Sequence, residues 1–214
     1  TLQPLFSPVT LPFLRDAFLD LPQLVRVDPN GVGGTPVYYV NGMTTDLEDA
    51  RDEAEALSRH LHRAVDLLHN PTAGGGIVDG FEAVQDKFRF LLLGNLWPDP
   101  NPTTRQLAYL LYHARERVSI VSHSQGCLIT RNALNTANSF SAGNARNLVA
   151  WVATGVPLRD EEFYPLPRKF RPIRNPDDPV AQILGPRLDP SDLTGQGIEA
   201  HSFTRRYVPQ IRPE

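Results

Sequence analysis

Val121-Ser122-His123-Ser124-Gln125-Gly126 is the stretch of this 214-residue chain that decides its fold. The β-prone residues Val118–Val121 predict a buried strand, and a helix is expected to follow directly. A tight turn between the two would lift the hydroxyl of Ser124 above the edge of a sheet. That turn requires small residues two positions before and two positions after the serine, because the strand and helix backbones approach closely there. Ser122 and Gly126 meet the requirement, and we expect position 122 to need nothing beyond small size.

Strands and helices alternate along the chain from Pro36 onward. Strands are expected at Val37–Val40, Val65–Leu68, Val118–Val121, Leu148–Ala153, Phe170–Arg174 and near Ile198. Helices are expected from Thr45 (a capping box with Glu48), between Phe81 and Leu92, from Thr103 or Thr104 to Arg117, from Gln125, and over Val180–Leu184. Such alternation is typical of an α/β fold, with a mainly parallel sheet and helices on both faces.

The first part of the chain has a different character. Residues 1–36 are rich in proline and are expected to form an N-terminal arm or a lead-in from a larger protein, ahead of one domain over residues 37–214. The sequence begins at Thr1, as expected if an initiator methionine or a signal segment has been removed. The compartment is therefore left open, and no oligomeric state is predicted.

Composition excludes several classes of function. A net charge of −3 argues against nucleic acid as a partner, and no apolar run is long enough for a transmembrane helix. The single cysteine, Cys127, excludes an internal disulfide. Gly74–Gly76 lacks the Lys-Ser/Thr of a phosphate loop. No carboxylate or cysteine joins the histidines at 60, 62 and 69 at metal-ligand spacing. We therefore expect no cofactor and no metal.

The His-Ser-Gln-Gly core of the elbow resembles the α/β-hydrolase superfamily, particularly its lipase and esterase branches. The resemblance runs from Val37 to Tyr207 as an order of elements, and Ser122 stands where the family usually has glycine. It implies a three-layer α/β-hydrolase-like domain. It also implies a serine hydrolase that cleaves carboxylic esters, with lipid or acyl esters as the substrate class, through an acyl-enzyme on Ser124.

The family's order of nucleophile, acid and histidine then selects the other catalytic residues. Only one of the six histidines, His201, follows Ser124, so it is the expected base; a surface histidine is the competing interpretation. Asp178 matches the family's aspartate-x-valine pattern and is the expected acid, ahead of its neighbour Asp177. The fallback acids are Asp160, Glu161 and Glu162.

The resemblance also implies the surroundings of the serine. Backbone N–H groups of Gln125 and Met43 are the expected oxyanion donors, and Gly42 permits the turn before Met43. His123, next to the serine, is expected to be structural or to line the pocket. Gly155–Arg168 occupies the position of a lid, where Phe163 and Tyr164, with Leu166, would form an apolar rim for peripheral lipid contact or else pack onto the sheet edge.

Two other functions remain open from the sequence. An acyltransferase or thioesterase would use the same three residues and differ only in the group that accepts the acyl chain. A non-catalytic hydrolase-like module would serve as a binding domain of a larger protein.

Overall fold

The computed structural model describes residues 24–31, 35–43, 45–71, 101–140, 144–156, 167–175, 177–178 and 199–212. Within these ranges six strands form one sheet in the order β1-β3-β2-β4-β5-β6. Strands β3, β2, β4, β5 and β6 are parallel, and β1 pairs with β3 in the antiparallel sense. The predicted α/β class with a mainly parallel sheet is confirmed.

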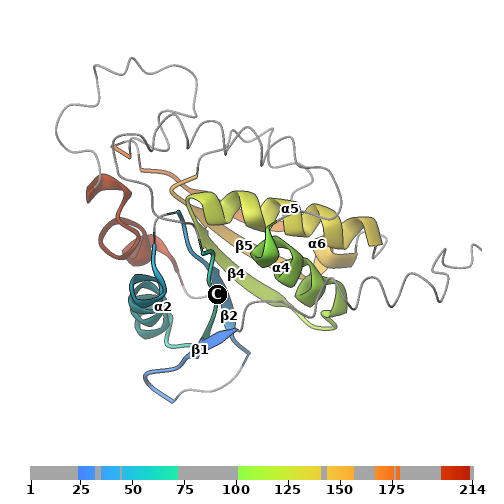
Figure 1. Ribbon diagram of the computed structural model, residues 1–214, viewed down its shortest axis with the longest axis horizontal. Coiled ribbons are helices and arrows are strands. Elements are labelled where there is room, and N and C mark those ends of the chain that lie inside the picture. Colours follow the sequence, from blue (N-terminus) through green and yellow to red (C-terminus); the bar gives the residue numbers. More distant parts are fainter. Residues whose placement is uncertain are drawn as a thin grey trace, which may run out of the picture.

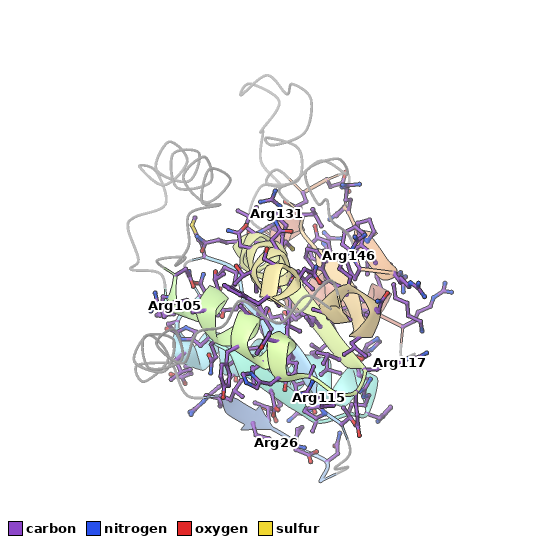
Figure 2. All side chains as sticks on the ribbon, turned by 90° about the vertical axis from the view of Figure 1, so that its right-hand side faces the viewer. Arg26, Arg105, Arg115, Arg117, Arg131 and Arg146 are labelled. Atoms are coloured by element: carbon purple, nitrogen blue, oxygen red, sulfur yellow. The ribbon has the colours of Figure 1, made fainter. Side chains whose placement is uncertain are left out.

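Helices lie on both sides of this sheet. The strands are Val25–Val27 (β1), Val37–Val40 (β2), Val65–Leu68 (β3), Val118–His123 (β4), Val149–Thr154 (β5) and Lys169–Ile173 (β6). The helical elements are Leu47–Leu61 (α2), Pro102–His113 (α4), Gln125–Phe140 (α5), Asn144–Leu148 (α6), Glu199–His201 (η3), Phe203–Tyr207 (η4) and Val208–Gln210 (η5). Figure 1 shows α4, α5 and α6 on one side of the sheet, and α2 with the C-terminal turns on the other. Figure 2 shows α4 and α5 lying across the sheet, seen from their own side. None of the helices in the described part of the chain combines the length and the apolarity needed to cross a membrane.

Two hydrophobic cores follow from this layering. One lies between the sheet and α4–α5 and includes Ile120 and Trp151. The other lies between the sheet, α2 and the C-terminal turns, and includes Val121 and Phe203. Ile120 and Val121 are consecutive residues of β4, so their side chains point to opposite faces and supply one core each.

Several element boundaries differ from those expected. Asp46, not Thr45, caps α2, because its carboxylate accepts the N–H of Asp49 at 2.8 Å. The hydroxyl of Thr45 instead donates to the carbonyl of Met43. Helix α4 ends at His113, four residues before the expected Arg117, and Leu148 belongs to α6 rather than to β5.

Strand β1 was not expected, although Val25-Arg26-Val27 is followed by the turn-forming residues Asp28-Pro29-Asn30-Gly31. Its pairing with β3 shows that residues 25–27 already belong to the sheet. The division of the chain at residue 36 stays a prediction. The helices expected between Phe81 and Leu92 and over Val180–Leu184, and the strand expected near Ile198, lie outside the described residues.

Gly126 permits the closest approach between the sheet and a helix. A Cβ at this position would lie 2.3 Å from the carbonyl oxygen of Val40 and 2.8 Å from that of Asn41. Both neighbours are backbone atoms that no side-chain rotation can move. The requirement for glycine at the start of α5 is therefore steric, as the sequence predicted.

Gly126→Ala should lower the stability of the fold. Helix propensity alone would make alanine more stable than glycine by about 1 kcal/mol. The clash with the carbonyl of Val40 should reverse that sign and cost about 1–3 kcal/mol, as overpacking does. Urea unfolding followed by circular dichroism measures the difference, with Ser139→Ala on the exposed side of the same helix as control. A Gly126→Ala variant more stable than the parent would contradict the close approach.

Candidate active site

Ser124 occupies a sharp turn between β4 and α5. Its φ is 52°, in the left-handed region that residues other than glycine seldom adopt. Two backbone hydrogen bonds hold it there. Its N–H donates to the carbonyl of Thr154 at 2.9 Å, and its own carbonyl accepts the N–H of Cys127 at 2.9 Å. The side chain therefore projects from the carboxyl-terminal edge of the sheet, as the sequence pattern predicted.

The loop after β2 lies against Ser124. A Cβ at Gly42 would be 3.0 Å from the Cβ of Ser124, so glycine allows the loop to approach this closely. On the other side of the serine, Gln125 begins α5. Its backbone N–H has no hydrogen-bond partner among the described residues, as is usual in the first turn of a helix. Both expected oxyanion segments therefore border the serine.

His201 and Asp178 come together at the same edge. Nδ1 of His201 lies 2.8 Å from Oδ2 of Asp178. The Asp178 side chain is completely buried, whereas the His201 side chain is 20% exposed. Asp177 is exposed, and its N–H donates to the side chain of Asn175. The structure thus pairs the histidine with Asp178 and directs Asp177 to the surface.

Tyr207 is a member of this cluster that the sequence did not indicate. Its hydroxyl donates to Oδ2 of Asp178, the oxygen that also contacts His201. The ring is fully buried in the C-terminal turn η4. Burial raises the pKa of Tyr207, and the hydrogen bond and charge of Asp178 raise it further, so the hydroxyl stays a donor. No local sequence pattern distinguishes this tyrosine, because its partner lies in a distant loop.

Asn175 ties the acid to the histidine. Its side-chain amide donates to the carbonyl of Ala200 at 3.0 Å, and its backbone carbonyl accepts the N–H of Asp178 at 3.0 Å. The loop after β6 and the turn that carries His201 are therefore held to each other through one residue.

His123 packs against the ring of His201, with the two centroids 4.5 Å apart. Burial and the nearby charge of His201 lower the pKa of His123 well below its usual value, so His123 is neutral. Within the described residues, its Nε2 has no hydrogen-bond partner. Gly155, at φ +57°, allows both rings to approach, since a Cβ there would lie 2.9 Å from that nitrogen. His123 thus packs against His201, as a structural histidine would, and the expectation that it lines a substrate pocket stays a prediction.

A buried network of amides supports the start of α5. The side chain of Asn70 donates to the side chain of Gln125 at 2.7 Å, and its backbone N–H donates to Asn41 at 2.7 Å. Asn101, the cap of α4, donates to Asn70 as well. The carboxyl ends of β2 and β3 and the beginnings of two helices are therefore fixed to one another. The sequence signal for this network was an asparagine just after each of two expected strands, Asn41 and Asn70.

Ser122 does more than provide a small side chain, contrary to expectation. Its hydroxyl accepts the indole N–H of Trp151 at 2.8 Å and donates to the sulfur of Cys127 at 3.3 Å. All three residues are buried. Ser122 therefore serves as a hydrogen-bonding centre between β4, β5 and α5.

Some residues of the expected site are not in contact with each other, and others lie outside the described residues. Among the described residues, no hydrogen bond joins the hydroxyl of Ser124 to His201. Phe163, Tyr164 and Leu166 lie outside the described residues, as do Asp160, Glu161 and Glu162. His60 and His69 contact the backbone carbonyls of Ile211 and Thr45. Within the described ranges, no group of three or more potential ligand side chains could hold a metal ion.

Besides Asp178, the structure places the carboxyl of Glu53, in α2, near His201. The hydroxyl of Tyr39 donates to it at 2.7 Å, and the ring of Tyr39 stacks on Phe203. Burial raises the pKa of Glu53 from 4.5 to about 7, while the bond from Tyr39 and the charge of His201 act in the opposite direction.

The raised pKa of Glu53 predicts a pH-dependent stability. Because its folded pKa is above its unfolded pKa, the neutral carboxyl is favoured in the fold, and stability falls as pH rises from 4.5 to about 7. Glu53→Gln removes this loss and keeps an acceptor for Tyr39. The variant should be more stable than the parent at about pH 8, by at most roughly 3 kcal/mol, and nearly equal at about pH 4. Denaturant unfolding at both pH values measures this; the exposed Asp52→Asn is the control. Equal effects of Glu53→Gln at both pH values would contradict it.

Comparisons with known proteins leave the function to be argued from this geometry. No protein-family model matches the sequence, and neither a curated protein nor a solved structure matches the chain.

Proposed function

We propose that this chain is a serine hydrolase of the α/β-hydrolase type that cleaves carboxylic esters, with lipid or acyl esters as its substrate class. One observation carries the proposal. Ser124, held at φ 52° between a strand and a helix, projects from the sheet edge at which His201 and Asp178 form a hydrogen-bonded pair. Nucleophilic catalysis requires a serine and an oriented histidine at one site, and a strained backbone at the serine is typical of such sites.

The chemistry follows from the direction of proton flow. The pair with Asp178 keeps the proton of His201 on Nδ1 and leaves Nε2 free to accept the proton of Ser124 as its oxygen attacks the ester carbonyl. The tetrahedral oxyanion then accepts hydrogen bonds from the backbone N–H groups of Gln125 and Met43. Its collapse expels the alcohol, which takes the proton from His201. Water, deprotonated by the same histidine, then releases the carboxylic acid and restores the serine.

Two features support this division of roles. Complete burial of Asp178 makes its charge interact strongly with an imidazolium at His201. His123, kept neutral by burial, adds no positive charge that would oppose protonation of its neighbour. The same three residues would serve an acyltransferase or thioesterase, in which another nucleophile replaces water or a thioester replaces the ester.

The non-catalytic alternative has one observation in its favour. No hydrogen bond links Ser124 to His201 within the described part of the chain. Catalytic hydrogen bonds are often long without substrate and shorten when it binds, so this gap is compatible with catalysis. In a binding module, Ser124 and His201 would form no hydrogen bond even with the ligand bound, and the serine would be unreactive.

Labelling with a fluorophosphonate separates these two functions, because the probe reports an activated serine without assuming a substrate. The parent chain should be labelled, and Ser124→Ala should not be labelled while remaining folded. Asp178→Asn should slow labelling by up to about 10,000-fold, since it disrupts the tautomer of the base. Asp177→Asn, at the exposed neighbour, is the matched control and should label at nearly the parental rate. An unlabelled but folded parent chain would rule out the proposed hydrolase.

Tyr207→Phe tests the positioning of the acid. The variant removes only the hydroxyl that donates to Asp178. Hydrogen bonds to charged groups contribute about 1.5–3 kcal/mol, and loss of part of this orientation should reduce kcat/KM about tenfold. With one donor fewer, the carboxylate attracts the protonated His201 more strongly, so the acid limb of the kcat/KM profile should move to higher pH. The exposed Tyr112→Phe is the control. A slower variant with an unmoved acid limb would indicate a merely structural tyrosine.

A further inference from the structure

A cavity of about 250 Å³ lies at the opposite edge of the sheet, at the amino-terminal ends of the parallel strands. Its lining includes a cross-strand row over β2, β4, β5 and β6, in which each residue pairs with the next: Val37, Ser119, Ala150 and Lys169. Ser119 and Ser124 are five positions apart, roughly 17 Å at the rise of a strand. The cavity is therefore separate from the candidate active site.

Over the described part of the chain, one face of the sheet is incompletely covered beside this cavity. In β5, Val149, Trp151 and Ala153 are buried on the α5 side, whereas Ala150 and Val152 on the other side remain partly exposed. Val121 and Val152 contribute apolar surface to the floor, and Leu61 and Ile211 line the cavity from α2 and the C-terminal end.

The charged residues that line the cavity all have the same sign. Five of its residues are cationic and none is acidic: Arg63, Arg168, Lys169, Arg171 and Arg212. Arg63 and Arg171 each donate to one backbone carbonyl, of Thr35 and Gln210. Among the described residues, Arg168 and Arg212 have no ion pair. The whole chain has a net charge of −3, so this grouping does not reflect a basic composition.

We propose that this cavity binds a small carboxylate with an apolar body, of the size of a medium-chain fatty acid. Guanidinium groups match carboxylate oxygens in planar, paired hydrogen bonds, and the valines and leucine can cover a hydrocarbon chain. An engineered apolar cavity of about 150 Å³ binds benzene, so a space of about 250 Å³ can accept the larger octanoate. The site does not depend on the hydrolase activity proposed above.

Isothermal titration calorimetry with octanoate tests the site. The parent chain should bind one octanoate, and the affinity should fall as salt rises. Arg168→Gln/Arg212→Gln removes two exposed cations of the rim and should weaken binding about tenfold or more. Arg51→Gln/Arg131→Gln removes the same charge from α2 and from α5, where Figure 2 shows Arg131, and should bind like the parent. Val152→Phe fills the floor and should abolish binding without removing charge.

Two neutral or small probes complete the test. Octanol lacks the charge and acetate lacks the chain, so each should bind at least about tenfold more weakly than octanoate. Binding that survives both Arg168→Gln/Arg212→Gln and Val152→Phe would overturn the proposal, as would equal affinity for octanol or acetate. The titration is repeated on chain whose Ser124 carries the phosphonate, where octanoate should still bind. Loss of binding only in that labelled chain would place the ligand at the active site and overturn the inference. If the chain does not react with the phosphonate, the titrations of the variants and of the other probes still test the site.

Discussion

A serine at a φ of 52° costs about 1–3 kcal/mol relative to ordinary backbone, and the surrounding structure must hold it there. The hydrogen bond from its N–H to the carbonyl of Thr154 couples this turn to the end of β5. The absence of a side chain at Gly126 lets α5 begin directly against β2. The amide network of Asn41, Asn70 and Gln125 then fixes the same helix end laterally. The sheet edge is thus organised around one unfavourable backbone conformation.

The positions of Asp178 and His201 depend on charge, whereas the position of Ser124 depends on a strained backbone. A buried carboxylate is costly unless donors satisfy it, and Asp178 receives His201 and Tyr207 on one oxygen. Asn175 holds the two loops that carry this pair. A neutral histidine, His123, packs its ring at a tilt against the ring of His201. The acid and the base are therefore positioned by contacts that do not involve the serine.

Local sequence patterns predicted the central strands and the elbow because each depends on residues within one short segment. Val37–Val40 and Val65–Leu68 are apolar runs closed by turn residues, and small size at Gly126 is a local requirement. The contacts of Tyr207 with Asp178 and of Trp151 with Ser122 join residues 29 positions apart, which no periodicity records. For the same reason the partial exposure of Ala150 and Val152 in β5 could not be foreseen, since it depends on which distant elements cover that face of the sheet. The order of residues indicated Asp178 and His201, but only the fold shows that they are in contact.

The segment 199–212 has a consequence for biosynthesis. It supplies His201, stacks Phe203 on Tyr39, and brings Tyr207 to the buried carboxylate. Because a ribosome makes the chain from its N-terminus, these contacts form after every strand of the described sheet has been synthesised. A nascent chain that stops before residue 199 would have its elbow serine but would lack His201 and Tyr207, which contact Asp178, and Phe203, which stacks on Tyr39. Emergence of residues 199–212 from the ribosome therefore supplies both the aromatic contacts beside α2 and the histidine that pairs with Asp178.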